Sequence, residues 1–190
     1  MKDILNIFYN GWSRAKPVKH LVMDQLSQSL SLVCPRPELS LRFGQEEDID
    51  TYLDLQQKAY RGYIAWRYRD FKNDWDMNPH GVYLILEERD SNGIKRPIGV
   101  VTGRFKSYGA HISHLMVDPE YQGQDHGKFL LGKWIEGVRL FGLPKISLEV
   151  RASNQRAQDL YFQSGFIKDH VKRAYYSDNR EDAWGMVYYL

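Results

Sequence analysis

The chain has 190 residues, enough for one complete domain and marginal for two. Hydrophobic residues make up 43% and charged residues 26%, proportions that exclude disorder along the whole length. The 26 basic and 24 acidic residues leave a formal charge of +2, too balanced to indicate a nucleic-acid or membrane-surface partner.

Cysteine content and the N-terminus indicate the compartment. The single cysteine, Cys34, excludes an intramolecular disulfide and fits a reducing environment. No apolar run approaches the roughly 18 residues of a membrane-spanning helix. The first residues, 1–6, lack the apolar core and small-residue cleavage site of a signal peptide. We therefore expect a cytoplasmic protein.

The N-terminal part is predicted to be an extension over residues 1–38, ahead of a main domain over residues 39–190. Two prolines in the segment Cys34-Pro35-Arg36-Pro37 forbid a helix that continues through it. Before this segment, apolar residues from His20 to Val33 follow a mostly helical spacing. We expect this helix to pack on the main domain. A dimer contact or a partner-binding arm is the functional alternative.

Helices and strands are predicted to alternate along the main domain. Turn residues at 90–93 indicate a β-hairpin, and Gly142 and Gly165 end two of the helices. In chain order the elements after residue 38 are a strand at 39–43, a helix at 45–60, strands at 82–87, 98–106 and 110–117, a helix at 127–141, a strand at 146–150, a helix at 154–164, and strands at 166–176 and 183–189. This order predicts an α/β fold (α+β) with one mixed, mostly antiparallel central sheet flanked by helices.

A polar loop between Val117 and the helix at 127–141 is the first segment that carries chemistry. Pro119 ends the strand ladder, and Gly123 and Gly127 permit close approach to the backbone. Free N–H groups at a helix N-terminus suit an anion such as a pyrophosphate, and Lys128 adds a cation. An ordinary polar connection with turn glycines explains the loop alone equally well.

A carboxylate and a phenol are the second chemical feature. On the strand at 146–150, Glu149 shares a face with Ser147 and lies opposite the apolar residues. Ser153 or Asn154 is suited to cap the following helix, whose inward stripe contains Tyr161. Glu149 and Tyr161 therefore come from neighbouring elements and are able to approach a common cleft.

Together these segments resemble the GNAT superfamily of acetyl-CoA-dependent N-acetyltransferases, and within it the ribosomal-protein-alanine N-acetyltransferases. The resemblance covers roughly residues 39–190. Its matches fall in the family's order: Val117-Asp118-Pro119 with the loop 122–128, then Leu148 to Phe166, then Tyr175-Tyr176 followed by Glu181-Asp182-Ala183 and Met186.

The resemblance implies a site for acetyl-CoA. It implies that the backbone of Leu115, Met116 and Val117 holds the pantetheine arm and that Asn154 contacts it. It implies that the following loop residues hold the pyrophosphate: Gln122, Gly123, Gln124, Asp125, His126, Gly127 and Lys128. Asp125 departs from the family at the loop's middle glycine, where a carboxylate near a pyrophosphate weakens binding.

The resemblance also implies the chemistry, with Glu149 as base and Tyr161 as acid. The expected partners are acetyl-CoA and an acceptor amine, foremost the N-terminal α-amine of a ribosomal protein; no metal, membrane or direct nucleic-acid partner is expected, and a homodimer is left open. The alternatives are a small-molecule amine (polyamine, amino acid or antibiotic) as acceptor, and a non-catalytic acyl-CoA-binding module.

Each site residue has a purely structural alternative. Glu149 could pair with Arg151 as a surface carboxylate, and Tyr161 could be a core aromatic. His114 is the reserve candidate for the base, although its odd spacing from His111 sends the two rings to opposite faces unless a bulge intervenes.

Two aromatic segments are expected to line the acceptor side. The stretch from Tyr60 to Lys72 lies where the family shapes its acceptor site, but carries no Pro-Trp segment. A packed aromatic helix with a solvated basic face explains this stretch about as well, and its rings and arginines could be mistaken for an RNA-binding strip. Tyr175 and Tyr176 are the other expected acceptor-lining residues.

Overall fold

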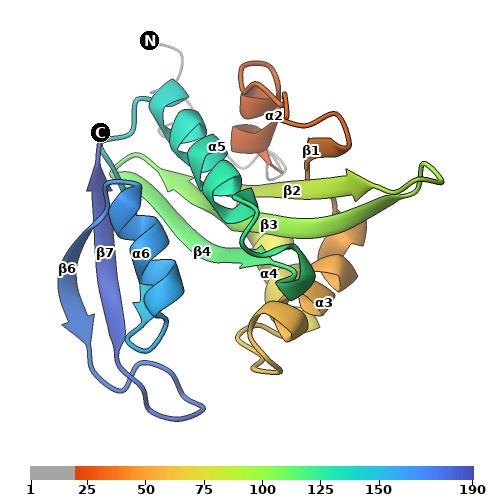
Figure 1. Cartoon of the computed structure of the whole chain (residues 1–190). Coiled ribbons are helices and arrows are strands. Elements are labelled where there is room, and N and C mark those ends of the chain that lie inside the picture. Colours follow the sequence, from red (N-terminus) through yellow and green to blue (C-terminus); the bar gives the residue numbers. More distant parts are fainter. Residues whose placement is uncertain (1–19) are drawn as a thin grey trace.

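A seven-stranded mixed sheet organises the residues that the computed structural model describes, 20–190 (Figure 1). The strand order is β1-β2-β3-β4-β5-β7-β6, and β4 with β5 is the parallel pair among antiparallel ones. The strands are β1 (Leu39–Phe43), β2 (Gly81–Arg89), β3 (Lys95–Lys106), β4 (Gly109–Val117), β5 (Lys145–Arg151), β6 (Ile167–Lys172) and β7 (Ala183–Tyr189). The predicted fold class is confirmed.

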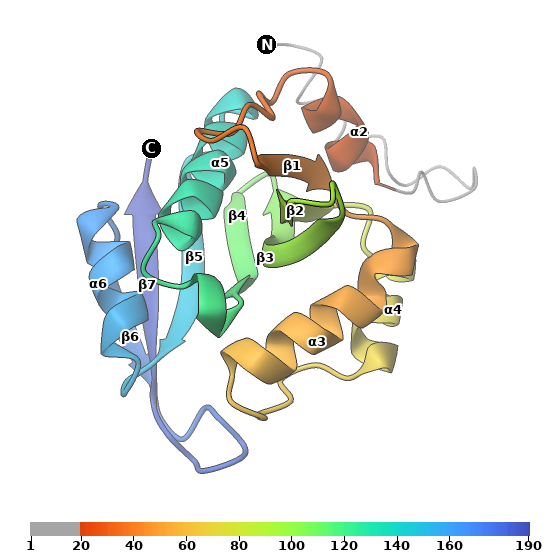
Figure 2. The same cartoon turned by 45° about the vertical axis from the view of Figure 1, so that its right-hand side comes forward.

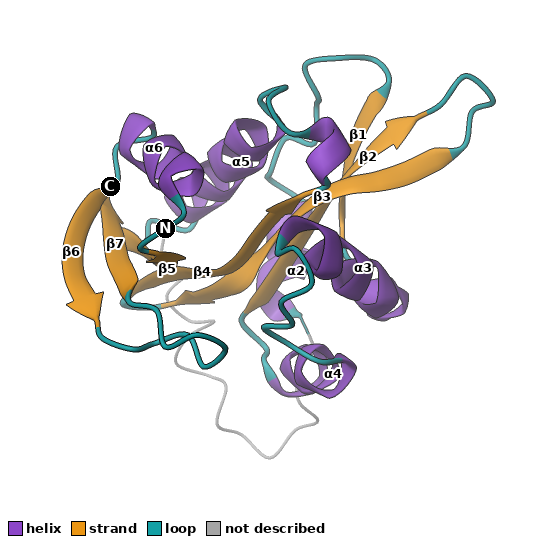
Figure 3. Ribbon diagram, turned by 60° about the horizontal axis from the view of Figure 1, so that its bottom comes forward, coloured by secondary structure: helices purple, strands orange, loops and turns teal. Residues whose placement is uncertain are grey.

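Helices cover both faces of the sheet. Figure 3 shows α5 and α6 on one face and α3 and α4 on the other. The helices are α2 (Leu21–Ser27), α3 (Ile49–Ala59), α4 (Tyr68–Met77), α5 (His126–Leu140) and α6 (Gln155–Gln163), with short 3-10 helices η1 (Glu46–Asp48) and η2 (Pro119–Tyr121). The site described below lies where these layers meet at the middle of the sheet.

Helix α5 packs on the sheet through an apolar stripe. Its residues Leu130, Leu131, Trp134 and Val138 are fully buried, at the spacing expected of one helix face. The Trp134 ring meets the ring of Phe105 on β3 edge to face, with centroids 5.0 Å apart. This packing fixes α5, and with it the loop at its N-terminus, against the central strands.

Aromatic residues fill the opposite layer, between α3, α4 and the sheet. Tyr52 on α3 lies 5.6 Å from both Phe71 on α4 and Tyr83 on β2, measured between ring centroids. Gly44 lies against this group, because an added Cβ would come within 2.0 Å of the Tyr52 hydroxyl. The chain therefore turns tightly from β1 into α3 under the aromatic cluster.

The segment before β1 also joins the core. Val22, Met23 and Leu26 on α2 are buried, and Leu26 lies close to Gly137 of α5. The helix predicted at 20–33 is shorter than expected, since α2 ends at Ser27. The remainder of the predicted extension, residues 1–19, lies outside the described residues, and the boundary at residue 38 stays a prediction.

Most predicted elements agree with the structure in position. Figure 2 shows α3 beside α4, which begins inside the aromatic-basic stretch and continues past Lys72 to Met77. The predicted strand at 166–176 is shorter, because β6 ends at Lys172 and the chain then loops back to β7. No helix among residues 20–190 combines the length and apolar character needed to cross a membrane.

Candidate active site

Strands β4 and β5 separate after a short parallel pairing, which opens the middle of the sheet. Their paired residues are Ala110 with Ile146, His111 with Ser147 and Ile112 with Leu148. Beyond Ile112, β4 keeps β3 on one edge and has no strand on the other. Glu149 is the first residue of β5 past the last pair, so its carboxylate lies at the apex of the opening.

Backbone alternation decides which groups of β4 face this opening. The Asp118 N–H donates to the Ile98 carbonyl of β3 at 2.9 Å. In an antiparallel ladder only alternate residues bond to the partner strand, so Met116 also bonds toward β3. The N–H and C=O groups of Leu115 and Val117 therefore point into the opening, which makes these two the better placed of the three predicted residues.

The loop after β4 presents a row of backbone N–H groups. Among residues 20–190, the N–H groups from Gly123 to Lys128 find no backbone or side-chain acceptor. Gly123 has φ +83° and Asp125 has φ +62°, both in the left-handed region. Asp125 thus occupies a conformation that favours glycine, which agrees with the family's glycine at this position.

Two arginines that the sequence did not single out lie next to this loop. Arg156 on α6 donates to the side-chain oxygen of Gln122 at 2.9 Å, and the Gln122 amide donates to the Val117 carbonyl at 2.9 Å. Arg36 lies 3.0 Å from Nε2 of His126, the first residue of α5. Burial and the Arg36 charge lower the pKa of His126. Both arginines therefore place a cation beside the loop.

The α6 residues adopt the predicted geometry in part. Asn154, not Ser153, caps α6, since its side-chain oxygen accepts from the Ala157 N–H at 3.1 Å. Tyr161 is buried and lies 5.5 Å from the Phe166 ring. Burial raises the pKa of its phenol. No hydrogen-bond partner of the Tyr161 hydroxyl is found within residues 20–190, so among these residues the phenol O–H is not donated to another group.

Glu149 pairs with Lys172, a residue that the structural alternative did not name. Its Oε1 accepts from Lys172 Nζ at 2.7 Å, and its Oε2 lies 3.4 Å from His111 Nε2. The other imidazole nitrogen of His111 lies 3.0 Å from the Ser147 hydroxyl. Burial lowers the pKa of His111, while the hydrogen bond to Glu149 raises the pKa of Lys172. The pair with Arg151, which was the structural alternative for Glu149, is not formed.

Arg151 instead joins two loops. Its guanidinium makes two 2.9 Å bonds to Asp178 and one of 3.0 Å to Glu181, both in the loop between β6 and β7. It also lies 4.5 Å from the Tyr63 ring centroid and 3.9 Å from that of Tyr176. The predicted acceptor-lining loops are therefore held together over the same face as Glu149.

His114 lies deep in the α3–α4 side of the site. A register shift between Thr102 and Gly103 leaves Ser113 as an extra residue in β4, which is the bulge that the spacing of His111 and His114 required. Both rings consequently face the α3–α4 side. The Tyr60 hydroxyl lies 3.3 Å from Nδ1 of His114, and burial lowers the pKa of His114 to about 4.

The Tyr60–Lys72 stretch combines packed rings with exposed charges. Trp66 lies 4.7 Å from the His114 ring, and its backbone N–H and C=O both bond to the buried side chain of Gln56 at 2.8 Å. Arg61, Arg67 and Arg69 are exposed. This arrangement matches the packed aromatic segment with a solvated basic face.

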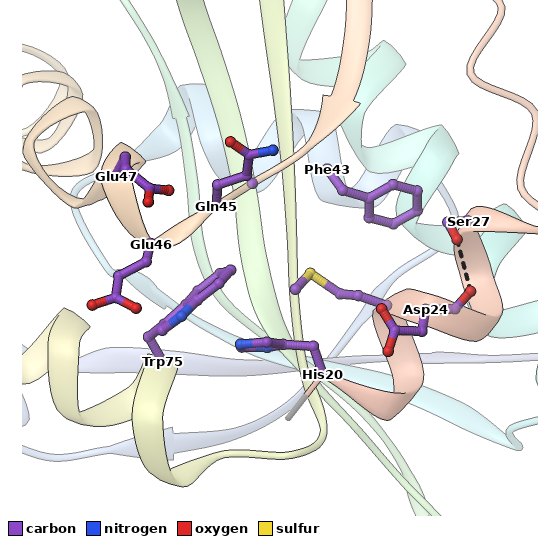
Figure 4. A pocket seen from close by; sticks show the side chains of 10 residues that line it. His20, Asp24, Ser27, Phe43, Gln45, Glu46, Glu47 and Trp75 are labelled. Atoms are coloured by element: carbon purple, nitrogen blue, oxygen red, sulfur yellow. Dashed lines mark hydrogen bonds between the residues drawn. The ribbon is translucent and has the colours of Figure 1, made fainter. Parts of the chain in front are cut away.

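A hollow of about 550 Å³ lies apart from this site (Figure 4). It is bounded by α2, the segment after β1 and Trp75 of α4, and contains the carboxylates of Asp24, Glu46 and Glu47. None of its lining residues belongs to the opening between β4 and β5. Among residues 20–190, no group of three His, Cys, Asp or Glu side chains is placed to hold a metal ion.

Comparison with known proteins identifies the family. Residues 49–166 match the acetyltransferase (GNAT) family. These residues include β4, the loop from Gly123 to Lys128, Glu149 and Tyr161. The chain belongs to the GNAT family. Its members are acetyltransferases that use acetyl-CoA as co-substrate, so the protein is an acyltransferase enzyme.

Relatives and solved structures extend this result. A Bacillus subtilis protein named putative [ribosomal protein bS18]-alanine N-acetyltransferase is 31% identical over 148 residues, 78% of this chain and 93% of that protein. The crystal structure of the ribosomal-protein-S18-alanine N-acetyltransferase from Escherichia coli has a TM-score of 0.68, with 27% identity and coverage of 78% of this chain and 92% of that one. A spermidine N-acetyltransferase SpeG chimera from Vibrio cholerae and hSSAT has 20% identity and a TM-score of 0.66 over 80% of this chain and 95% of that one, and shows the fold alone.

Proposed function

We propose that the protein transfers the acetyl group of acetyl-CoA to the N-terminal α-amine of a protein, of the ribosomal-protein-alanine type. The observation that carries this proposal is the opening between β4 and β5, with Glu149 at its apex; Tyr161 is buried on α6, the helix that follows β5. The names of the relatives at 31% and 27% identity support the acceptor class. A cytoplasmic location and a possible homodimer stay predictions.

The residues around the opening suit acetyl-CoA. Leu115 offers its backbone N–H and C=O to the amides of a pantetheine arm, whereas the C=O of Val117 accepts from Gln122. The loop from Gly123 to Lys128 offers six N–H groups to a pyrophosphate. Arg36 and Arg156 add cations beside this loop. The side-chain oxygen of Asn154 is engaged in its helix cap, which leaves its amide N–H₂ for the cofactor arm.

Glu149, Val117 and Tyr161 each take one part of the acetyl transfer. An α-amine, with a reference pKa of about 8, is mostly protonated at neutral pH and must lose a proton before it attacks the thioester carbonyl. Glu149 takes this proton directly or through one water. The N–H of Val117 is placed to stabilise the oxyanion, because it faces the opening, whereas that of Met116 bonds to β3. Tyr161 then protonates the CoA thiolate as the C–S bond breaks.

The acceptor enters past the two loops that Arg151 joins. Tyr63 and Tyr176 present ring faces and hydroxyls there, suited to the backbone and small side chain of a peptide N-terminus. His114 is less well placed for the base role than Glu149, because its ring is buried against Trp66 and Phe71 and Tyr60 engages its Nδ1.

The test is mass spectrometry after incubation with acetyl-CoA and a lysine-containing peptide with a free N-terminal alanine, beside an N-blocked twin. We expect one acetyl group on the free α-amine and none on the twin. Acetylation of neither peptide by a protein that binds acetyl-CoA would refute the N-terminal class. Transfer to a polyamine, amino acid or antibiotic in a parallel panel would then establish a small-molecule acceptor.

Variants test the roles of the two residues. We expect Glu149→Gln and Tyr161→Phe each to lower kcat by about 10²–10⁴-fold, the range of general acid–base catalysis, with acetyl-CoA binding retained. Glu120→Gln and Tyr108→Phe, at exposed positions, are the matched controls. Unchanged turnover in Tyr161→Phe would exclude the acid role, and an unchanged pH–rate profile in Glu149→Gln would exclude the base role.

A further inference from the structure

An amine of the protein itself lies beside the proposed base. Lys172 is the last residue of β6, and its Nζ donates to Glu149 Oε1 at 2.7 Å. The ammonium also lies 5.1 Å from the Tyr175 ring centroid. The second oxygen of Glu149 faces His111. A primary ammonium therefore occupies the position at the apex of the opening that an acceptor amine must reach to give its proton to Glu149.

We propose that Lys172 is an internal acetyl acceptor, modified within its own molecule when acetyl-CoA is bound and no other acceptor fills the site. This proposal rests on the proposed function. The Glu149 carboxylate takes a proton from the Lys172 ammonium, and the neutral amine attacks the thioester carbonyl. The C–S bond breaks, the CoA thiolate gains a proton, and the products are N-acetylated Lys172 and CoA.

The placement singles out Lys172 among the lysines of the described residues. Lys168, on the same strand, places its ammonium 3.6 Å from the centroid of the Trp184 ring and forms no ion pair within residues 20–190. Lys58, Lys72, Lys95 and Lys133 pair with carboxylates on α3, α4, β2, α5 or in neighbouring turns. Lys172 alone of these pairs with Glu149, and its side chain is 39% exposed, which leaves room for an acetyl group.

The internal reaction is slower than transfer to an α-amine. The ion pair with Glu149 raises the pKa of Lys172, so the reactive neutral amine is scarce at neutral pH. The reference pKa values of lysine and of an α-amine already differ by about 2.5, which makes the neutral fraction of lysine roughly 300-fold smaller. A peptide N-terminus that displaces Lys172 from Glu149 therefore outcompetes it, and acetylated Lys172 accumulates only without an acceptor.

The experiment incubates the full chain with acetyl-CoA alone, followed by intact mass and peptide mapping. We expect a single acetyl group at Lys172, formed at a rate per molecule that is independent of protein concentration. Saturating alanine peptide suppresses it at least tenfold. The modification is lost in Lys172→Arg and in Glu149→Gln, and persists in Lys168→Arg, the matched control on the same strand.

Three results would overturn the proposal. The first is acetylation of Lys172 no faster than that of Lys168. The second is a rate of Lys172 acetylation per molecule that rises with protein concentration. The third is equal acetylation of Lys172 in the folded chain and in the chain unfolded by urea. The alanine peptide assay, run in parallel, separates the two proposals. Peptide transfer without Lys172 acetylation overturns this inference alone, whereas loss of both in a protein that binds acetyl-CoA overturns the proposed function as well.

Discussion

The buried imidazole of His114 makes the stability of the protein depend on pH. The residue is 4% exposed, its Nδ1 faces the Tyr60 hydroxyl, and its Nε2 has no hydrogen-bond partner within residues 20–190. Burial lowers its pKa from the ordinary 6.5 to about 4. Protonation at pH 5 therefore occurs readily in the unfolded chain and rarely in the folded one.

The sign and size of the effect follow from this difference. Between pH 6.5 and pH 4 the unfolded state binds more protons at this site, so the free energy of unfolding falls as the pH falls through this window. A His114 pKa of 6.5 in the unfolded chain and of about 4 in the folded one lowers the free energy of unfolding by about 2 kcal/mol from pH 7 to pH 5. The loss reaches about 3 kcal/mol once the pH is below 4.

Urea unfolding followed by tryptophan fluorescence measures this loss. His114→Phe keeps an aromatic ring without a titrating group, so we expect wild type to lose about 2 kcal/mol more than this variant from pH 7 to pH 5. His170→Asn, at an exposed histidine of β6, is the control and retains the wild-type pH dependence. An equal loss in wild type and His114→Phe would show that the imidazole protonates without leaving its contacts, and would refute the reasoning.

Three further predictions concern the backbone and the loops. Gly103→Ala places a Cβ 1.9 Å from the His111 carbonyl oxygen, and we expect urea unfolding to show a loss of about 2–4 kcal/mol. Asp125→Gly relieves a residue in the left-handed region and removes a charge beside the loop amides, so calorimetry should show a several-fold tighter complex with acetyl-CoA. Asp125→Asn removes the charge but keeps a side chain, and so separates the two causes. Unchanged affinity for acetyl-CoA in both variants would contradict both. Arg151→Lys loses the two-bond contact with Asp178 and the stacking on the Tyr176 ring. Steady-state kinetics should therefore show about a tenfold higher KM for the alanine peptide at similar kcat. An unchanged KM would exclude a role of Arg151 in positioning the acceptor loops.

The sequence alone predicted the elements whose signals are local. The limits of β1 and β7 agree with the predicted strands at 39–43 and 183–189. Apolar and polar residues alternate in β1, and β7 is a short apolar and aromatic run; both patterns indicate a strand directly. The hairpin turn forms where predicted, with Gly93 at φ +81° and the Asp90 side chain accepting from the Asn92 and Ile94 N–H groups. The motif resemblance led to the family for the same reason, since each motif is a short run of neighbouring residues.

The tertiary structure alone decided which distant side chains meet. Glu149 pairs with Lys172 and not with Arg151, although Arg151 is two residues away on the same strand face, because β6 and β7 bring Lys172 back to the apex of the opening. The extra residue Ser113 in β4 turns His114 to the same side as His111. No local sequence pattern predicts this bulge. Local propensity depends on neighbours along the chain. Ion pairs between strands depend on register, which the packing of the whole sheet between its two helical layers determines.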